Sequence, residues 1–338
     1  MPIVYRDEDA DLAQLQGRPV GVIGYGHLGR PFALNLRDSG VEVIVSERDP
    51  ARLEQAQAEG FAAAPADELA RRCRVLLLLV SDEAMPRVYL EQVSPNLQRG
   101  DMLVFSSAYN VAFGYIEAPP FVDVGLIAPR TLGAAVRERY ESGEGFFSFI
   151  AVGQDATGRA WPTLLALAGA VGTLRAGAVE IAFEREAELD LFVQQAVLPA
   201  LHHVLASAAR LLIDAGHPPE VVFTELYLSG ELRDYLDRAG RSGLIAALRQ
   251  TSLTGQYGAF TRFDRFNDLK LQRLMEITLE EIRAGDFARE WAKECGDNYR
   301  RLRRALKSQE AVDLWELEQQ AIDLLYPLRD AEDNIFKL

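Results

Sequence analysis

Residues 24–29 follow a G-x-G-x-x-G pattern directly after a short apolar run. In this pattern Gly24 permits a tight turn, Gly26 lets the backbone approach a pyrophosphate, and Gly29 lets a helix pack closely on a strand. The amides at the start of the next helix then face the phosphates. The pattern predicts a dinucleotide site formed by Gly24, Tyr25, Gly26, His27, Leu28 and Gly29.

An acidic residue follows this turn at the expected distance. Glu47 comes about 20 residues after Gly26, where a carboxylate accepts hydrogen bonds from both hydroxyls of an adenosine ribose. The same carboxylate would repel a 2′-phosphate, which favours NAD over NADP. Arg48 argues the other way, because a guanidinium beside the ribose can hold that phosphate. We expect NAD as the cofactor, with Glu47 and Arg48 both at its ribose.

The elements around these residues alternate between strand and helix. Strands are predicted at residues 19–23 and 41–45 and helices at 31–38 and 49–59. Further apolar strands follow at residues 75–80, 102–106, 122–128 and 147–152. This succession predicts an α/β fold with a doubly wound Rossmann sheet.

Two polar residues follow the strand at residues 75–80. Ligands of open α/β sheets lie outside the carboxyl ends of the strands, so Ser81 and Asp82 can line a cofactor crevice. Either residue could equally cap the next helix. Both interpretations stay open at this point.

From about residue 182 the pattern becomes helical. Apolar residues recur at spacings of three and four in four long segments, which are residues 183–215, 219–239, 269–283 and 287–306. We therefore expect a Rossmann dinucleotide-binding domain at residues 1–182 and a helical domain at residues 183–330, which would carry substrate and metal sites and the dimer contacts.

Composition excludes several classes of function. The chain has 338 residues, with a hydrophobic share of 49% and a formal charge of −14. The negative charge argues against nucleic acid or an anionic membrane as a partner. No apolar run approaches the roughly 20 residues of a membrane span, and the N-terminus is acidic, so we expect a cytoplasmic protein. Cys73 and Cys295 have no CxxC or histidine partner nearby, which makes a disulfide framework or zinc site a poor hypothesis.

Several segments together resemble one known family. Residues 33–40, 94–97, 152–158, 190–192, 195–198, 218–220 and 285–291 resemble ketol-acid reductoisomerase, and the similarity extends over about residues 17–310. The resemblance implies a Rossmann domain followed by a knotted, intertwined helical domain, a nicotinamide cofactor, a hydroxy acid substrate, Mg²⁺, and a homodimer or higher homo-oligomer.

The family's functional positions are only partly kept. Its active-site histidine is replaced by Ser107, its Ala-Pro-Lys lysine by Arg130, and the Pro-Gly that follows becomes Leu132-Gly133. The resemblance places Ser107 and Gly133 at the cofactor. It assigns catalysis to Asp190, Glu225, Gln194, Ser107, Arg130, Ser252 and Ser229.

The loss of two carboxylates determines how many metal ions we expect. The family's two Mg²⁺ ions are balanced by four carboxylates, whereas here Gln194 and Ser229 stand where two of them would be. Asp190 and Glu225 balance one divalent ion, with Gln194 as a neutral oxygen ligand. Asp190 and Gln194 share a helix face at a spacing of four. We expect one ion or none, held by Asp190, Gln194 and Glu225.

A single ion points to altered chemistry, because alkyl migration is the step that most needs two metals. The best hypothesis is redox-neutral cyclopropanol formation from a sulfonium-bearing dihydroxy acid, as in one natural-product branch of such relatives. The C2 carbinol gives a hydride to NAD⁺, the ketone enolises, and C3 displaces dimethyl sulfide from C5. NADH then returns the hydride. Arg130 would hold the substrate carboxylate, and Ser107 and Ser252 would orient hydroxyls.

Three alternatives remain open. One is a plain NAD-dependent 2-hydroxy or 2-keto acid oxidoreductase, and another is an ordinary ketol-acid reductoisomerase. The third is of a different class: a catalytically inactive homologue that binds NAD as a sensor or binds a partner through its helical domain.

Overall fold

The protein is described from a computed structural model that covers residues 2–17, 19–267, 269–310 and 312–326. The chain divides into two compact units, residues 1–190 and 191–338, and the division falls within α8 (Phe183–Phe192). The predicted boundary after residue 182 lies at the start of that helix. Residues 327–330, at the end of the predicted helical domain, lie outside the described residues.

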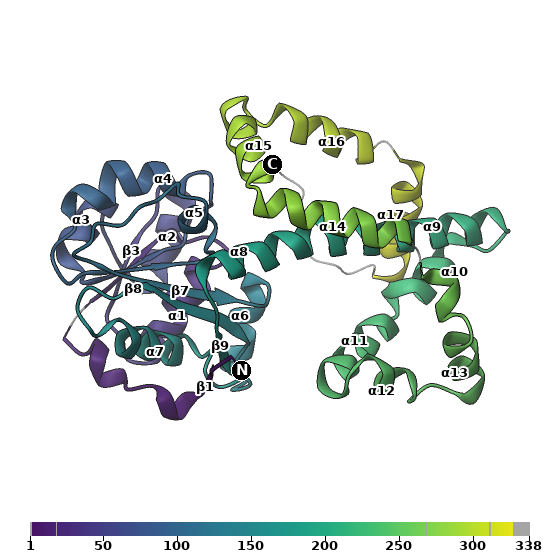
Figure 1. Ribbon diagram of the computed structural model, residues 1–338, viewed down its shortest axis with the longest axis horizontal. Coiled ribbons are helices and arrows are strands. Elements are labelled where there is room, and N and C mark those ends of the chain that lie inside the picture. The colour runs from purple at the N-terminus through teal and green to yellow at the C-terminus, as the bar shows by residue number, and fades with distance from the viewer. Residues whose placement is uncertain (1, 18, 268, 311, 327–338) are drawn as a thin grey trace. The chain divides into compact units, whose positions relative to one another are not determined.

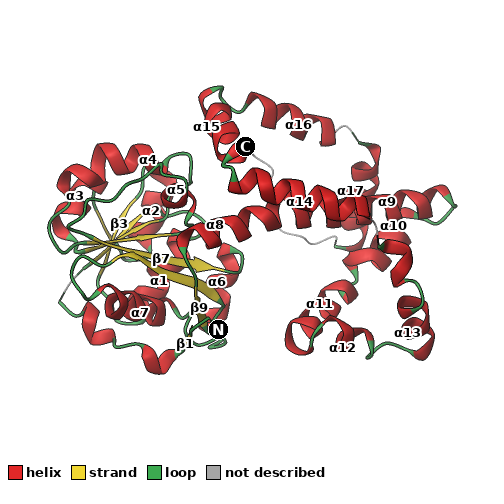
Figure 2. Cartoon of the chain, viewed as in Figure 1, coloured by secondary structure: helices red, strands yellow, loops and turns green. Residues whose placement is uncertain are grey.

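A nine-stranded sheet forms the centre of the first unit, counted over the described residues (Figures 1 and 2). Its order is β1-β9-β8-β7-β6-β5-β2-β3-β4, and the run from β7 to β4 is parallel throughout. The strands are β1 (Val4–Tyr5), β2 (Val20–Ile23), β3 (Val43–Ser46), β4 (Ala62–Ala63), β5 (Val75–Leu78), β6 (Met102–Phe105), β7 (Asp123–Pro129), β8 (Ser148–Gln154) and β9 (Ala178–Glu180). The predicted doubly wound α/β sheet is confirmed.

The sheet departs from the prediction at its edges. β8 pairs antiparallel with β7, and β1 pairs antiparallel with β9. The sequence did not predict β1, β4 or β9, because strands of two or three residues are too short to show a periodic pattern.

Helices cover both faces of the sheet because its central strands are apolar on both sides. Helices α1 (Gly29–Asp38), α6 (Gly133–Glu141) and α7 (Ala160–Val171) lie on one face in Figure 1. Helices α3 (Ala66–Arg72), α4 (Met85–Val88) and α5 (Tyr109–Ala112) lie on the other. Alternate residues of β2 and β5 enter the two cores, so Val22 belongs to one and Ile23 to the other. A further α-helix, α2 (Pro50–Ala58), follows β3.

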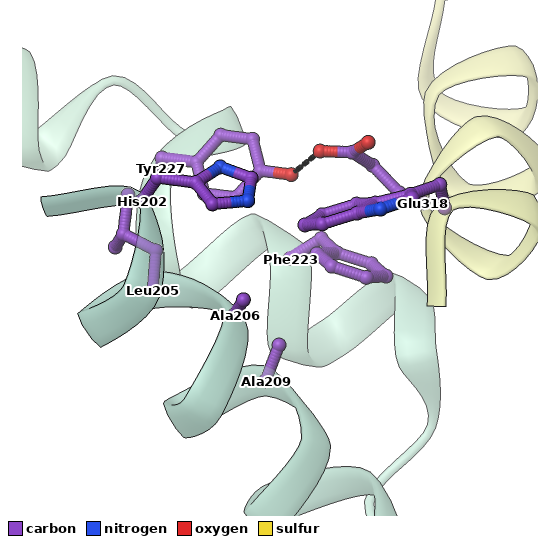
Figure 3. A pocket seen from close by; sticks show the side chains of 8 residues that line it. His202, Leu205, Ala206, Ala209, Phe223, Tyr227 and Glu318 are labelled. Carbon is purple, nitrogen blue, oxygen red and sulfur yellow. Dashed lines mark hydrogen bonds between the residues drawn. The ribbon is translucent and has the colours of Figure 1, made fainter. Parts of the chain in front are cut away.

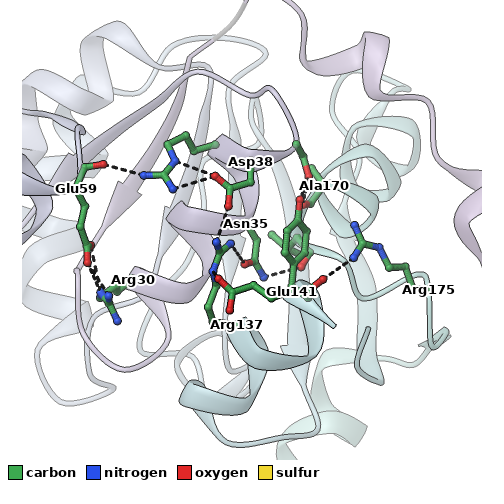
Figure 4. Close-up of polar contacts among 12 residues, drawn as sticks. Arg30, Asn35, Asp38, Glu59, Arg137, Glu141, Ala170 and Arg175 are labelled. Carbon is green, nitrogen blue, oxygen red and sulfur yellow. Dashed lines mark hydrogen bonds and ion pairs between the residues drawn. The ribbon is translucent and has the colours of Figure 1, made fainter. Parts of the chain in front are cut away.

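Polar side chains tie α1 to the helices beside it (Figure 4). Arg137 on α6 donates to Asn35 at 2.9 Å and forms an ion pair with Asp38 at 2.5 Å. The buried amide of Asn35 donates in turn to the carbonyl of Val171, at 3.0 Å. Since α1 begins at the glycine turn, these contacts fix the direction in which the turn's amides point.

The second unit is helical within the described residues. Its helices are α9 (Leu198–Asp214), α10 (Pro219–Phe223), α11 (Glu231–Ser242), α12 (Leu244–Leu248), α13 (Leu253–Phe260), α14 (Leu269–Arg283), α15 (Asp286–Gly296), α16 (Arg300–Glu310) and α17 (Asp313–Leu325). A small core joins α9, α10 and α17 through Ala209, Val222, Phe223, Leu314 and Ala321.

Two predicted helices of this unit are interrupted. The predicted helix 219–239 breaks at Gly230, whose φ of 86° lies in the left-handed region that glycine adopts without strain. The predicted helix 287–306 breaks at Asn298 and Tyr299, which both have positive φ. Apolar residues continue at helical spacing on both sides of each break, so the periodicity predicted one continuous helix in each case.

The expectation that no segment is long and apolar enough to span a membrane does not hold for one helical run. The run Phe183–Asp214 is 32 residues long and apolar enough to cross a membrane by length and composition alone. Gln194, Gln195, His202 and His203 divide the part after Leu191 into short apolar stretches, so no long continuous apolar run was visible in the sequence. Within this chain only 11% of its most apolar window is buried.

Candidate active site

The glycine turn is packed too tightly for side chains at two of its three glycines. A Cβ atom on Gly29 would lie 1.8 Å from the carbonyl oxygen of Gly24, and one on Gly24 would lie 2.8 Å from the carbonyl oxygen of Leu79. Gly24 also has a φ of 101°. A Cβ atom on Gly26 would meet only Arg52 Nη1, at the ordinary contact distance of 3.5 Å. The fold therefore leaves the space above Gly26 open, as pyrophosphate binding requires.

Gly133 packs against the same turn. A Cβ atom there would lie 2.2 Å from the carbonyl oxygen of His27, so α6 begins directly beside the glycine turn. The His27 side chain is exposed. The structure thus brings the predicted residue Gly133 next to residues 24–29, although the two are far apart in the sequence.

Glu47 anchors the turn from the end of β3. Its carboxylate accepts hydrogen bonds from the backbone amides of Tyr25 at 2.7 Å, Arg48 at 2.7 Å and Asp49 at 2.8 Å. A carboxylate has about four acceptor positions, so these amides leave room for a ribose hydroxyl. Arg48 is exposed.

The side chain of Tyr25 faces away from the space that a cofactor would use. Its ring is buried in an edge contact with Phe61, and its hydroxyl donates to Glu59, which also pairs with Arg30 at 2.6 Å. Tyr25 therefore offers a cofactor its main chain only. Leu28 is half-buried and packs against the core on the α1 face.

At the carboxyl ends of β5 and β6, the polar side chains bind one another. Asn110, which is buried, donates to the carbonyl oxygen of Asp82 at 3.0 Å and to its Oδ1 at 3.3 Å. Ser81 donates to Glu83 at 2.6 Å, and the start of α4 has no side-chain cap, so Ser81 does not cap that helix. After β6, the Oγ of Ser107 accepts from the Tyr109 amide at 3.3 Å.

Arg130, at the end of β7, lies between two carboxylates of α8. Its Nη2 pairs with Glu186 at 2.8 Å and its Nη1 with Asp190 at 3.0 Å, while its Nε donates to the carbonyl oxygens of Ala128 and Pro129. The guanidinium also lies 5.0 Å from the centre of the Phe149 ring. Glu186 is fully buried and accepts a further hydrogen bond from the Ala108 amide at 3.1 Å. The Arg130 guanidinium, which we predicted to hold a substrate carboxylate, thus pairs with two of the protein's own carboxylates.

Two carboxyl groups in this region have a raised pKa. Burial, and next the charges of Glu83, Asp190 and Glu186, raise the pKa of Asp82 to about 6. Burial also raises the pKa of Glu186, against the opposing effect of Arg130. Arg130 pairs with both Glu186 and Asp190, and Asp82 lies close enough to be affected by the charges of both carboxylates.

The raised pKa of Asp82 gives a stability prediction. Its pKa lies near 4 in the unfolded chain and about 6 in the folded one, so the stability that the protonated acid contributes is present below pH 4 and is lost as the pH rises through 6. We expect Asp82→Asn to be more stable than the unmodified protein by about 2 kcal/mol at pH 8, and equally stable at pH 4. Urea unfolding at both pH values measures this. A constant difference would contradict it.

The remaining predicted residues belong to the second unit. Gln194 lies in the π-helical turn Val193–Val197 and Glu225 in the π-helical turn Thr224–Leu228, and both side chains are exposed. Ser229 ends the second of these turns, and the Oγ of Ser252 caps α13 by accepting from the Gly255 amide at 3.1 Å. Single π-helical turns are frequent at functional sites. Because of the first turn, a shared face for Asp190 and Gln194 does not follow from α-helical spacing.

The donor chemistry at these positions fits Mg²⁺. Asp190 and Glu225 supply carboxylate oxygens and Gln194 an amide oxygen, which are ligand types that Mg²⁺ prefers. Across the part of the chain that the structure describes, no three His, Cys, Asp or Glu side chains group as metal ligands. Asp190, Gln194 and Glu225 remain the proposed ligands.

Sequence reasoning missed three residues of the site: Glu186, Asn110 and Arg52. Glu186 precedes Asp190 by one helical turn, so an acidic pair at a spacing of four was visible in the sequence. Asn110 and Arg52 had no such signal, because only the folded chain places them beside Asp82 and Gly26.

The fold and the site together define a dinucleotide-binding oxidoreductase. A glycine turn on a doubly wound sheet, closed by Glu47 and followed by an acidic site at the carboxyl edge, is the arrangement of that class. Residues 14–177 match the family of the acetohydroxy acid isomeroreductase NADPH-binding domain, and residues 183–325 match the ketol-acid reductoisomerase C-terminal domain. The chain belongs to the ketol-acid reductoisomerase family.

Known relatives agree with this assignment. The ketol-acid reductoisomerase (NADP(+)) of Methanopyrus kandleri is 41% identical over 296 residues, which cover 87% of this chain and 89% of the relative. That of Pyrobaculum aerophilum is 36% identical and covers 96% of this chain and 99% of the relative. A solved NADH-preferring ketol-acid reductoisomerase from an uncultured archaeon superposes with a TM-score of 0.89 at 29% identity, over 95% of this chain and 99% of that one. The predicted family, fold class and enzyme class are confirmed, and the cofactor is a nicotinamide dinucleotide.

Proposed function

We propose that this reductoisomerase-like enzyme oxidises and re-reduces a 2,3-dihydroxy acid without alkyl migration, and that its product is a cyclopropanol. The observation that carries the proposal is the acidic site around Arg130. It keeps Asp190 and the buried Glu186 but pairs both with one guanidinium, while Gln194 and Ser229 carry no charge. The two neutral residues leave Asp190 and Glu225 as the charged ligands, which supports one divalent ion, and alkyl migration is the step that most needs two.

The chain's own residues would position the reactants. The bound nicotinamide would accept a hydride from the C2 carbinol of the substrate and return it at the end. The glycine turn and Gly133 would hold the dinucleotide. The carboxylate of Asp190 would hold substrate oxygens, and Arg130, once displaced from Asp190, would face the substrate carboxylate.

The ring closure balances in atoms and electrons. After oxidation at C2 the substrate loses a proton from C3. The C3 electron pair then forms a bond to C5 while the C5–S bond breaks, which releases neutral dimethyl sulfide from the sulfonium group. Return of the hydride to C2 restores the alcohol and the oxidised cofactor.

The direct test measures dimethyl sulfide in the headspace over the enzyme with NAD⁺, Mg²⁺ and a sulfonium-bearing 2,3-dihydroxy acid. Release that needs all three components supports the proposal. If acetolactate and reduced cofactor yield dihydroxyisovalerate instead, the enzyme is an ordinary ketol-acid reductoisomerase. Hydride exchange on a 2-hydroxy acid without a change of skeleton supports the plain oxidoreductase. Turnover that survives Asp190→Asn would contradict the role of Asp190, and cofactor binding without any turnover would support the inactive homologue.

We further propose that NADH binds more tightly than NADPH. Glu47 at the ribose position would repel a 2′-phosphate, and the NADH-preferring structural neighbour supports the same preference. Arg48 and Arg52 oppose it, because both lie near the turn. Titration with both cofactors should give a dissociation constant for NADPH about tenfold larger, since one uncompensated charge contact costs about 1.4 kcal/mol. A smaller constant for NADPH would contradict the role of Glu47.

A homodimer is proposed from the second unit. Apolar side chains on and before α9 are exposed within one chain, namely Val193, Val197, Leu198, Leu201 and Val204. An apolar surface of this kind marks an interaction site. The charged first turns of the run Phe183–Asp214 favour a protein interface over a membrane span, which agrees with the expected cytoplasmic location. Sedimentation of a single monomeric species at micromolar concentration would contradict the dimer.

A further inference from the structure

The helical unit contains a small cavity whose lining is aromatic on most sides (Figure 3). His202, Leu205, Ala206 and Ala209 reach it from α9, Phe223 and Tyr227 from α10 and the π-helical turn after it, and Trp315 and Glu318 from α17. The rings of His202 and Trp315 lie 5.1 Å apart. The cavity holds about 110 Å³, somewhat less than a cavity of about 150 Å³ that binds benzene.

The one carboxylate in this lining has no cationic partner among the described residues. Glu318 accepts a hydrogen bond from the Tyr227 hydroxyl, and no described lysine or arginine forms an ion pair with it. Its side chain is half-buried against the aromatic rings. A half-buried carboxylate without a counter-ion leaves its negative charge available to a cation that enters the cavity.

From this arrangement we infer that the cavity binds a small onium cation, a methylated ammonium or sulfonium group. The faces of Trp, Tyr and Phe rings attract such cations, and several rings around one cavity form an aromatic cage. Glu318 supplies the opposite charge. The floor of Leu205, Ala206 and Ala209 gives apolar contact to the methyl groups and no hydrogen bond from a side chain, which suits a cation without N–H donors.

The lining also argues against other ligand classes. An anion would meet Glu318 with no described arginine or lysine to hold it. A primary ammonium ion would bring three N–H donors, and the aliphatic side chains of Leu205, Ala206 and Ala209 can accept none of them. None of the residues that line the cavity has a role in the reaction proposed above, so the inference does not rest on that reaction.

The test compares choline with its neutral isostere 3,3-dimethylbutan-1-ol on the full-length protein. The two molecules have nearly the same shape, so their difference in affinity isolates the charge. A ligand-observed NMR titration should give saturable choline binding at millimolar concentration, and the isostere should bind roughly tenfold more weakly. Equal binding of both would overturn the proposal and leave an apolar cavity only, and so would the lack of saturable choline binding.

Two variants locate the bound cation. Glu318→Gln keeps the size of the side chain and removes its charge, so it should weaken choline binding about tenfold and leave binding of the isostere unchanged. Glu316→Gln is the matched control, because Glu316 is exposed on the same helix and does not line the cavity. Equal choline affinity in both variants would place the cation elsewhere.

Discussion

Replacing Gly26 with alanine should abolish tight dinucleotide binding and leave the fold intact, whereas the same change at Gly29 should destabilise the first unit. A Cβ atom on Gly26 meets only the end of the Arg52 side chain, at 3.5 Å, but it occupies the space that a pyrophosphate needs. A Cβ atom on Gly29 would lie 1.8 Å from a backbone oxygen, which cannot move without shifting the turn. We expect Gly26→Ala to raise the dissociation constant for NADH by a factor of ten or more, about 1.4 kcal/mol. Gly29→Ala should cost about 3 kcal/mol of stability.

Thermal unfolding and NADH titration, carried out on both variants, separate these effects. Gly26→Ala should keep the melting temperature of the unmodified protein while its NADH affinity falls. Normal NADH affinity in Gly26→Ala would show that the cofactor does not lie over the turn. A fully stable Gly29→Ala would show that the turn can open, contrary to its packing.

Replacing Arg130 with alanine should produce the largest loss of stability at the acidic site. Glu186 is fully buried, and Arg130 is its cationic partner. Removing one partner of a buried ion pair leaves an uncompensated charge, which costs about 3–5 kcal/mol. The double variant Arg130→Ala/Glu186→Gln should recover much of that loss, because the remaining amide is neutral.

The matched control is Arg185→Ala on α8, the helix that carries Glu186. Arg185 pairs with Glu188 at 3.1 Å but is largely exposed, so its removal should cost less than about 1 kcal/mol. Urea unfolding of the four proteins measures all of these values. If the double variant were no more stable than Arg130→Ala, the cost would come from lost packing on Phe149 and not from the charge of Glu186.

The sequence predicted those parts of the fold that have a strong local signal. The apolar strands β2, β5 and β6 and the glycine turn were legible, because each is a continuous run or a fixed spacing. Strands of two or three residues were not, since their pairing depends on partners far along the chain. The breaks at Gly230 and Asn298 also escaped, because apolar residues continue at helical spacing on both sides.

The candidate site shows the same limit. Residue types identified Asp190 and Arg130, but only the folded chain shows that they bind each other and that Glu186 completes the group. The spacing identified Tyr25 as part of the turn, yet its side chain lies in the core, because Phe61 and Glu59 are available to it there. Partner choice is set by tertiary packing, which no local pattern encodes.

Glu47 has a consequence for attempts to redesign cofactor choice. The Glu47 carboxylate accepts a hydrogen bond from the Tyr25 amide and also lies at the position expected for the ribose. A smaller residue at position 47 would lose that hydrogen bond and make the glycine turn, which either cofactor would use, more flexible. An engineer who wants a protein that accepts the phosphorylated cofactor would do better to keep Arg48 and Arg52 and to replace Glu47 with glutamine, whose amide oxygen can still accept from the Tyr25 amide and does not repel a phosphate. In this chain, one side chain sets the choice of cofactor and also holds the glycine turn in place. A change at Glu47 that alters cofactor choice therefore also affects the stability of the turn.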